Sequence, residues 1–214
     1  MNEEPAVSQG GPLPFQQGHL ASLQDGLDFI NTLEYDRGQV TDELVSTEAA
    51  MDWLVRHDLM HREARDHLLK HFVDAPREST RILSKMKRVR GAMREVVDAT
   101  VEGRAPSQAD LKELNRALRT HYVYELVPAP DGLSLDHRHQ GDPVDGALAR
   151  LAESIARELI QGHPERLRIC ENDQCRYVFA DTSRTGRRKW CDMSTCGNRA
   201  KVARHRARQK ATTH

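Results

Sequence analysis

The amino-acid sequence predicts an α+β fold that is mostly α, with a helical N-terminal domain that contains one β-hairpin and a small C-terminal domain. Between residues 19 and 162, apolar residues recur mostly at the spacing of amphipathic helices that face a core. One stretch of this region changes to a period of two, which is typical of strands. All four cysteines lie between residues 170 and 196, and a dense basic segment follows them. This change of composition predicts a second, smaller domain.

The first four helices follow from apolar periodicity and from residues that start or stop helices. We expect helices over residues 19–33, 47–59, 61–73 and 77–102. Tyr35-Asp-Arg-Gly breaks the first helix. Pro76 suits the first turn of the fourth helix, and Gly103 ends it.

A fifth helix and the hairpin come next. Ser107, with Asp110 three residues later, resembles a capping box and begins a helix that runs to about Arg119. Residues 121–127 and 133–138 alternate like two strands, and a Pro- and Gly-containing turn separates them. The sequence therefore predicts one antiparallel hairpin in the N-terminal domain.

The last N-terminal helix sets the domain boundary. Asp142 caps it, Pro143 occupies its first turn, and Gly162 ends it. The predicted parts are a disordered polar arm (1–15), a helical domain (16–162) and a C-terminal domain (163–214).

The four cysteines form two C-x4-C pairs, Cys170 with Cys175 and Cys191 with Cys196. Thiolates are soft ligands that suit zinc, and a structural site takes four of them with no open position. Two disulfides, a redox-active pair and four buried free thiols are the alternatives. Disulfides need an oxidising compartment, but the N-terminus lacks the features of a secretory signal; redox pairs are more often C-x-x-C. We predict one structural Zn²⁺ bound by these four cysteines.

The size of the C-terminal segment supports a metal. Residues 163–214 include few large apolar side chains. A segment this short and this charged needs a further cross-link to fold. Structural zinc supplies an apparent binding energy of roughly 10–16 kcal/mol, which becomes folding energy. We interpret Tyr177, Phe179 and Trp190 first as a small core around the site. The C-terminal part is thus predicted to be a zinc-binding domain of two knuckles followed by a basic helix.

Charge is divided unevenly along the chain. Residues 163–214 hold 13 Lys and Arg against five Asp and Glu, a net charge of +8, whereas the remaining residues carry −8. Such an asymmetry indicates that the basic part contacts nucleic acid or another anionic surface.

Two basic clusters are predicted to bind DNA. One lies between the cysteine pairs, and the other lies on a C-terminal helix for which we take Asn198 as the cap. Ala200, Ala203 and Ala207 share one face of that helix, and we expect this face to pack on the zinc knuckle. A merely solvated charged helix is the alternative. The predicted DNA-contacting residues are Arg184, Arg187, Arg188, Lys189, Arg199, Lys201, Arg204, Arg206 and Arg208.

Two motifs resemble known families. The run from Asp181 to Lys201, which contains Cys196-Gly197-Asn198-Arg199, resembles the CGNR zinc finger. Gly26-Leu-Asp-Phe-Ile-Asn-Thr-Leu33 and the later Trp53-Leu54 resemble the ABATE domain that usually precedes this finger. The family is bacterial and is described as stress-induced transcription regulators. The resemblance therefore implies a zinc-dependent DNA-binding module in which the four cysteines bind zinc and Arg188 and Arg199 face DNA.

We predict a transcription regulator whose finger binds duplex DNA. Its helical domain is predicted to act as a sensor or as a dimerisation domain. An RNA-binding finger and a protein-interaction module without a nucleic-acid role are the alternatives. Familiar phosphate loops and nucleophile motifs are missing, so we expect no catalytic residues and no enzyme.

A single finger binds weakly, so we expect a homodimer formed by the helical domain. That domain is also where we would place a small-molecule effector. No apolar run reaches the ~18 residues of a membrane span, and we expect a cytoplasmic, nucleoid-associated protein.

Overall fold

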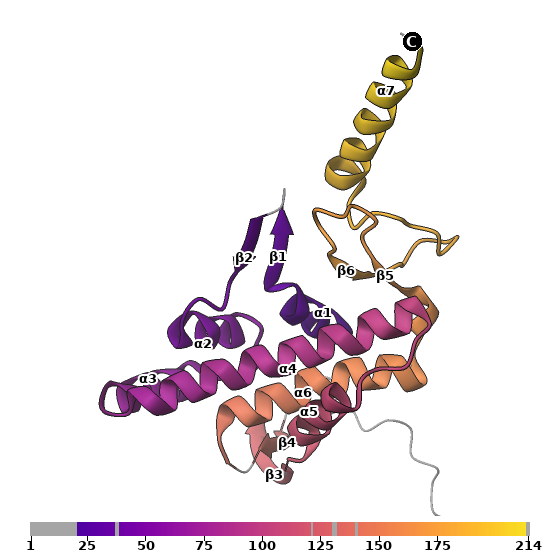
Figure 1. Cartoon of the computed structure of the whole chain (residues 1–214). Helices are drawn as coiled ribbons and strands as arrows, with labels where there is room; N and C mark the ends of the chain where they lie inside the picture. Colours follow the sequence, from indigo (N-terminus) through magenta and orange to yellow (C-terminus); the bar gives the residue numbers. More distant parts are fainter. Residues whose placement is uncertain (1–20, 37–38, 121, 130–131, 140, 213–214) are drawn as a thin grey trace, which may run out of the picture.

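The computed structural model describes residues 21–36, 39–120, 122–129, 132–139 and 141–212, and it shows a helical body with small hairpins and one projecting helix (Figure 1). The body contains α1 (Leu23–Asn31), α2 (Thr47–Arg56), α3 (Arg62–Asp74), α4 (Pro76–Glu102), α5 (Gln108–Leu118) and α6 (Pro143–Gln161). The antiparallel hairpins pair β1 (Leu33–Asp36) with β2 (Gln39–Asp42), β3 (Tyr122–Ala129) with β4 (Gly132–His139), and β5 (Leu167–Ile169) with β6 (Val178–Ala180). The short turns η2 (Pro164–Arg166) and η3 (Met193–Gly197) precede β5 and α7 (Asn198–Thr212) respectively. The predicted fold class, mostly α with a small C-terminal cysteine domain, is confirmed.

Helix α4 is the centre of the body. It packs against α1, α2, α3, α5 and α6, and also against β5 of the C-terminal segment. Met86 and Met93 are fully buried on its inner face, where they meet Leu148, Leu151 and Ile155 of α6 in one apolar core. Burial of such side chains contributes roughly 1.5–3 kcal/mol each, so this core dominates the stability of the fold.

Several helix ends are formed as the sequence predicts. The Asp142 carboxylate accepts a hydrogen bond from the Val144 N–H at 2.8 Å and caps α6. The Ser107 hydroxyl accepts one from the Asp110 N–H at 3.1 Å and caps α5. Gly103 ends α4 with a left-handed φ of 68°, a conformation that glycine adopts without steric cost.

The β1–β2 hairpin is a feature that the sequence analysis did not predict. Tyr35 and Asp36, interpreted as part of a break after the first helix, are the last two residues of β1, and the helix ends at Asn31 instead of Leu33. Arg90 of α4 braces it by donating to the Asp42 carboxylate at 2.6 and 3.1 Å. Burial alone would raise the pKa of Asp42, but the hydrogen bonds from Arg90 and Lys87 outweigh burial and lower it. Because β2 is held by an arginine that is distant in sequence, these short strands carry no local sequence pattern that predicts them.

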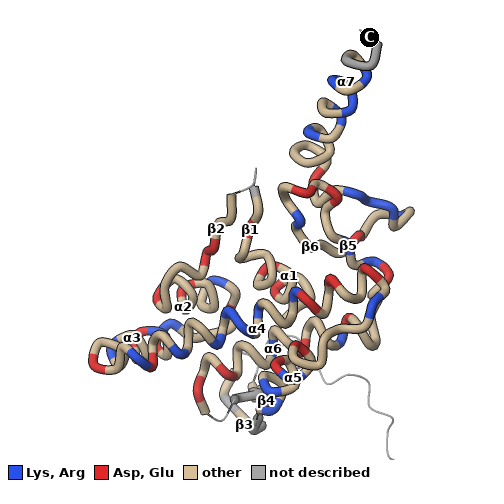
Figure 2. Tube along the Cα trace, in the orientation of Figure 1, with Lys and Arg blue, Asp and Glu red and all other residues tan. Residues whose placement is uncertain are grey.

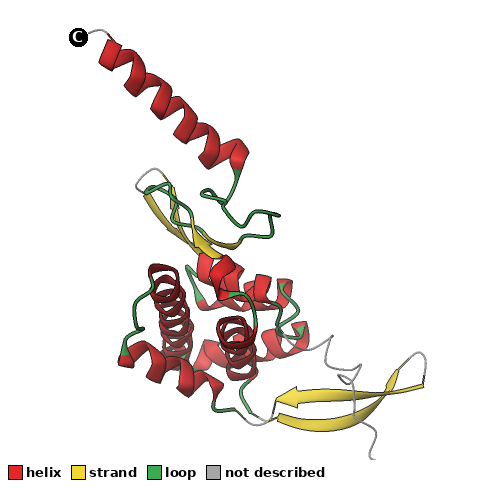
Figure 3. Cartoon of the chain, turned by 90° about the vertical axis from the view of Figure 1, so that its right-hand side faces the viewer, coloured by secondary structure: helices red, strands yellow, loops and turns green. Residues whose placement is uncertain are grey.

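The predicted hairpin is present as β3–β4, and it projects from the body at the end opposite α7 (Figure 3). It is longer than predicted, because Pro128 and Ala129 lie in β3 and Gly132 lies in β4. Leu126 and Leu133 are exposed on it. The proposed disordered arm, residues 1–15, lies outside the described residues. Among the described helices, none is both long and apolar enough to cross a membrane.

Candidate metal centre and nucleic-acid interface

The structure brings the four cysteines together. Their sulfur atoms all lie within 4.8 Å of one another, and none forms a disulfide. The Sγ atoms of Cys175 and Cys191 are 3.7 Å apart, and those of Cys191 and Cys196 are 3.9 Å apart. Four sulfurs about 2.3 Å from a tetrahedral zinc ion are about 3.8 Å from one another, whereas a disulfide joins two sulfurs at about 2.05 Å. The donor set and its spacing therefore fit one zinc ion.

The electrostatics of the cluster also favour a cation. Burial, followed by the neighbouring thiols, raises the pKa of Cys191. Burial also raises the pKa of Cys175 to about 11, because it outweighs a backbone hydrogen bond at Tyr177. Burial opposes ionisation of Cys196 as well, but a hydrogen bond from Asn172 and contacts with the other thiols lower its pKa. Several thiolates can share this space only if a positive ion balances them, so metal binding releases protons.

Asn172 shapes the first knuckle. Its carbonyl accepts a hydrogen bond from the Cys175 N–H at 2.7 Å, its Oδ1 accepts one from the Gln174 N–H at 3.2 Å, and its Nδ2 donates to Cys196 Sγ at 3.3 Å. One residue thus forms the turn through its backbone carbonyl and its side chain, and its side chain also contacts a sulfur of the other pair. The sequence analysis missed this residue, although an Asn between two cysteines is a known turn former.

Asp181 shapes the loop between the two knuckles. It is buried, and its carboxylate accepts hydrogen bonds from the Ser183 N–H at 2.9 Å and the Arg188 N–H at 2.8 Å. Burial raises the pKa of this carboxyl, but the hydrogen bonds from Ser183 and Arg188 outweigh burial and lower the pKa to about 2. Asp181 therefore stays ionised and holds the basic loop in place.

Arg188 faces inward. Its guanidinium lies 4.8 Å from the centre of the Phe179 ring and donates to the Cys191 carbonyl. These contacts hold the second knuckle, so the structure gives the Arg188 side chain a place inside the finger and not on its outer surface.

The Cys-Gly-Asn-Arg segment connects the metal centre to α7. The helical path begins before Asn198: Asp192 caps η3 by accepting from the Thr195 N–H at 2.8 Å. Asn198 has helical φ and ψ, and its side chain donates to the Ser194 carbonyl at 2.9 Å. The prediction that Asn198 is the cap is therefore wrong. An aspartate four residues before Cys196 caps the segment, so that η3 and α7 form one continuous helical path.

Helix α7 extends away from the rest of the molecule (Figure 1). Ala200 is half-buried, but Ala203 and Ala207 are exposed. The expected packing of the alanine face on the knuckle is therefore wrong beyond its first turn, because η3 directs the helix outward. Of the elements in the described part of the chain, α7 contacts chiefly η3.

The predicted DNA-contacting residues lie in two regions, the inter-knuckle loop and α7. Figure 2 shows Lys and Arg concentrated at this end of the molecule, whereas the helical body mixes both signs. Arg184 and Arg187 are exposed, and the exposed Lys189 pairs with Glu171 at 3.0 Å. On α7, the side chains of Arg199, Lys201, Arg204, Arg206 and Arg208 are exposed.

The finger is joined to the helical body by buried contacts. Leu167 of β5 and Val178 of β6 belong to the main apolar core. The Asn31 side chain donates to the Val178 carbonyl at 2.8 Å and accepts from the Val178 N–H at 2.9 Å. The Tyr177 hydroxyl donates to Asp28 at 3.4 Å. The polar residues of the Gly26–Leu33 motif thus hold the finger, a role that no local pattern indicates.

Comparison with known proteins agrees with this architecture. A family model described as "ABATE: Putative stress-induced transcription regulator" matches residues 26–163, and one described as "CGNR zinc finger" matches residues 166–209. No match was found among the curated proteins. Together with the sulfur geometry, these matches show a finger that binds a single structural zinc ion.

Proposed function

This chain belongs to the ABATE family, and from that premise we propose that it is a transcription regulator that binds duplex DNA through its zinc finger. The observation that carries the proposal is α7. It is a basic helix that projects from the metal centre and has exposed side chains from Lys201 to Gln209.

The charges of α7 call for an anionic partner. The helix holds six Lys and Arg and no Asp or Glu. Arg204 and Arg208 are spaced i,i+4, and such like-charge pairs destabilise a helix by a few tenths of a kcal/mol. Phosphates that lie between these side chains would remove the repulsion. With fifteen residues, α7 is about 22 Å long, and the major groove, about 12 Å wide, accepts one α-helix.

We assign the residues of the finger different roles in DNA binding. When bound, zinc ties the two knuckles together and thereby sets the direction in which α7 leaves. We assign Arg184, Arg187 and Lys189 to phosphates beside the groove, and the basic residues of α7 to the groove and its edges. We assign Arg188 to holding the second knuckle, because its side chain is occupied by Phe179 and Cys191.

One contact and the direction of α7 favour duplex DNA over the alternatives. A single-stranded RNA partner would stack bases on an open aromatic ring, but the Arg204 guanidinium lies 5.9 Å from the centre of the Trp190 ring. Masking of the finger by the acidic helical domain would need α7 to lie against that domain, and α7 points away from it.

The test is a salt titration of duplex binding by the zinc-loaded full chain. We expect the logarithm of affinity to fall linearly with the logarithm of salt concentration, by about 0.9 for each neutralised phosphate. Replacing Arg204 and Arg208 together by alanine should reduce this slope by about 2. The matched control replaces the exposed Arg62 and Lys70 of α3 and should leave the slope unchanged. A flat salt response, or equal effects of the two double variants, would overturn the proposal.

We further propose that the helical domain forms a homodimer, which would present two fingers to one DNA site. The protruding β3–β4 hairpin supports this assembly because it exposes Leu126 and Leu133 (67% and 73%). A two-stranded hairpin by itself is only marginally stable in water, and packing against a partner would stabilise it. A cytoplasmic, nucleoid-associated location belongs to the same proposal.

A further inference from the structure

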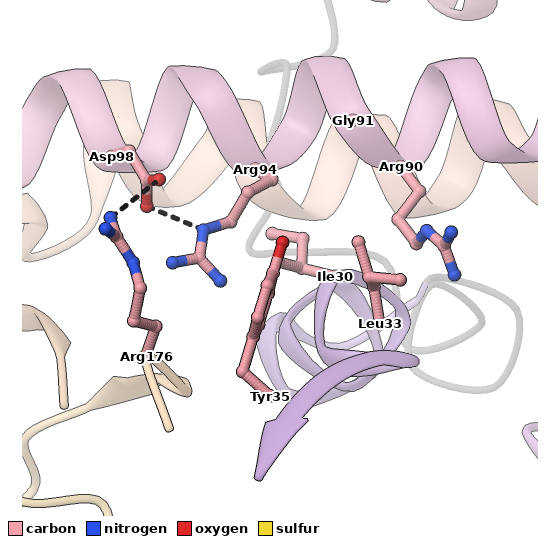
Figure 4. Close-up of a pocket in the computed structure, with 8 residues that line it drawn as sticks. All are labelled: Ile30, Leu33, Tyr35, Arg90, Gly91, Arg94, Asp98 and Arg176. Carbon is pink, nitrogen blue, oxygen red and sulfur yellow. Dashed lines mark hydrogen bonds and ion pairs between the residues drawn. The ribbon is translucent and has the colours of Figure 1, made fainter. Parts of the chain in front are cut away.

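A small cavity lies at the seam between the helical body and the finger (Figure 4). Its volume is about 260 Å³, and its walls come from α1, β1, α4 and the first cysteine knuckle. This is slightly below the ~300–1,000 Å³ of typical ligand pockets, so it suits a small metabolite. The cavity is separate from the proposed DNA-binding surface.

Its charged wall holds more positive than negative charge. Arg94 donates to the Asp98 carboxylate at 2.7 Å, and Arg176 of the knuckle lies 3.9 Å from the same carboxylate. Two guanidinium groups therefore share one acid. The third arginine of the lining, Arg90, is already paired with Asp42. Among the described residues that line the cavity, Asp98 is the only acid.

The opposite wall is apolar. Ile30, Leu33 and the ring of Tyr35 form it, and the Tyr35 hydroxyl points toward α4 (Figure 4). That hydroxyl has no hydrogen-bond partner within the described part of the chain. A cavity with paired arginines on one side and an aromatic and aliphatic wall on the other matches a ligand with an oxyanion at one end and an apolar group at the other.

Gly91 also lines the cavity, at an exposed position. It lies in the interior of α4, where glycine is less favourable than alanine by about 1 kcal/mol. A Cβ atom added at Gly91 would meet no other atom within 4 Å. Position 91 therefore has open space for a side chain beside the other residues that line the cavity.

We propose that this cavity binds a small organic anion, with a carboxylate or phosphate held between Arg94 and Arg176 and an apolar group packed on Ile30, Leu33 and Tyr35. Fork-shaped guanidinium groups bind both kinds of oxyanion in a bidentate manner. The ligand joins the helical body to the finger, because Arg94 belongs to α4 and Arg176 directly follows Cys175.

A regulatory consequence follows and rests on the proposed DNA-binding function. Arg176 has a left-handed φ of 52°, a conformation that costs a non-glycine residue free energy and persists only when its surroundings enforce it. A ligand that binds Arg176 changes the energy of this turn beside the metal centre. The ligand should therefore alter the affinity of the finger for DNA.

The experiment uses the zinc-loaded full chain with benzoate and phenyl phosphate as probes. Benzyl alcohol and inorganic phosphate serve as controls that carry only the apolar group or only the oxyanion. Amide chemical shifts of Gly91, Arg94 and Arg176 are followed by NMR during titration. We expect saturable shifts with at least one aromatic anion and at least tenfold weaker binding of both controls. Absence of saturable binding by benzoate and by phenyl phosphate overturns the proposal.

Three variants locate the site. Gly91→Leu adds a bulky side chain to the lining of the cavity and should abolish binding, whereas Ser84→Leu, at an exposed position of the same helix outside this cavity, should bind like the wild type. Arg176→Gly removes the guanidinium at a backbone conformation that glycine accepts, and should weaken binding at least tenfold. Unchanged affinity in Gly91→Leu would overturn the assignment to this cavity.

Duplex affinity with and without the bound probe tests the regulatory consequence separately. A change in wild type that is lost in Gly91→Leu supports it, and an unchanged affinity overturns it while the binding site stands. If the protein binds no duplex at all, the proposed function fails, but the NMR titration still decides the binding site.

Discussion

Buried polar side chains with complete hydrogen bonding join the two parts of this protein. Asn31 is 4% exposed, and it satisfies both the N–H and the carbonyl of Val178 in the manner of a neighbouring strand. An unpaired buried backbone group costs about 1–3 kcal/mol. The Asn31 side-chain amide thus allows the first residue of β6 to be buried against α1 with both of its backbone groups hydrogen-bonded.

Replacement of Asn31 by alanine should lower the free energy of unfolding by about 2–4 kcal/mol, because both Val178 backbone groups lose their partner in a buried site. Urea denaturation of the zinc-loaded protein measures the change, and amide hydrogen exchange at Val178 locates it. Asn115→Ala, at an exposed position of α5, is the control and should change stability by less than about 0.5 kcal/mol. Equal effects of the two variants would contradict this role of Asn31.

At the scale of elements, the close approach of α1 to α6 depends on a glycine. A Cβ atom at Gly26 would collide with Ser154 Oγ and lie 3.0 Å from Cδ1 of Ile155. Both of these α6 residues are buried. The two helices can therefore pack at this distance only where α1 lacks a side chain.

Gly26→Ala should destabilise the protein by about 1–3 kcal/mol, as overpacking of a filled core does. Gly91→Ala on α4 is the matched control, because its added methyl group meets open space. That variant should gain up to about 1 kcal/mol from helix propensity. Thermal unfolding of both variants checks the prediction, which is wrong if the two substitutions shift the melting temperature in the same direction.

The continuous path from η3 to α7 shows a second element-scale feature. Asp192, and not Asn198, begins it, and Cys196 lies within its first turns. A cysteine of the metal centre is thereby part of the same helical path as the basic side chains. This geometry explains why the predicted alanine face stays exposed: the helix leaves the knuckle along its axis and does not lie across it.

On the scale of the whole molecule, the main core and the metal centre are distinct but adjoining. The main core is built by the body helices and receives Leu167 and Val178 from the finger. A second apolar cluster surrounds the cysteines, with Phe179 buried and Tyr177 and Trp190 packed against it. The helical body and the cysteine knuckles are therefore in contact, but the main apolar core stabilises the body and the metal centre with its own small cluster stabilises the knuckles.

Removal of zinc by a chelator should abolish duplex binding and leave the helical body folded. The body keeps its own core, whereas the knuckles lose the metal that supplies much of their folding energy. Far-UV circular dichroism should retain most of the helical signal, and duplex titration should show loss of binding. Added zinc should restore binding, whereas added magnesium, which prefers oxygen ligands, should not. Cooperative loss of the whole helical signal on chelation would contradict this division.

Much of the fold could be predicted because the signals are local. The caps at Ser107 and Asp142 and the helical end at Gly103 involve residues close in sequence. The β1–β2 hairpin could not be predicted in this way, because Arg90 of α4 braces it through Asp42. Asn172 carries a recognisable turn preference, but its contact with Cys196 depends on how the two knuckles meet.

The sequence by itself determined the mostly helical fold and the zinc centre, since periodicity, caps and ligand chemistry depend on residue types at short spacings. Only the tertiary structure decided that Asn31 pairs with Val178, that Arg188 faces Phe179, and that α7 extends away from the helical body. It also placed Arg94 and Arg176 around one carboxylate. These contacts join residues from different elements, and the relative placement of elements follows from packing of the whole core, which no local pattern encodes.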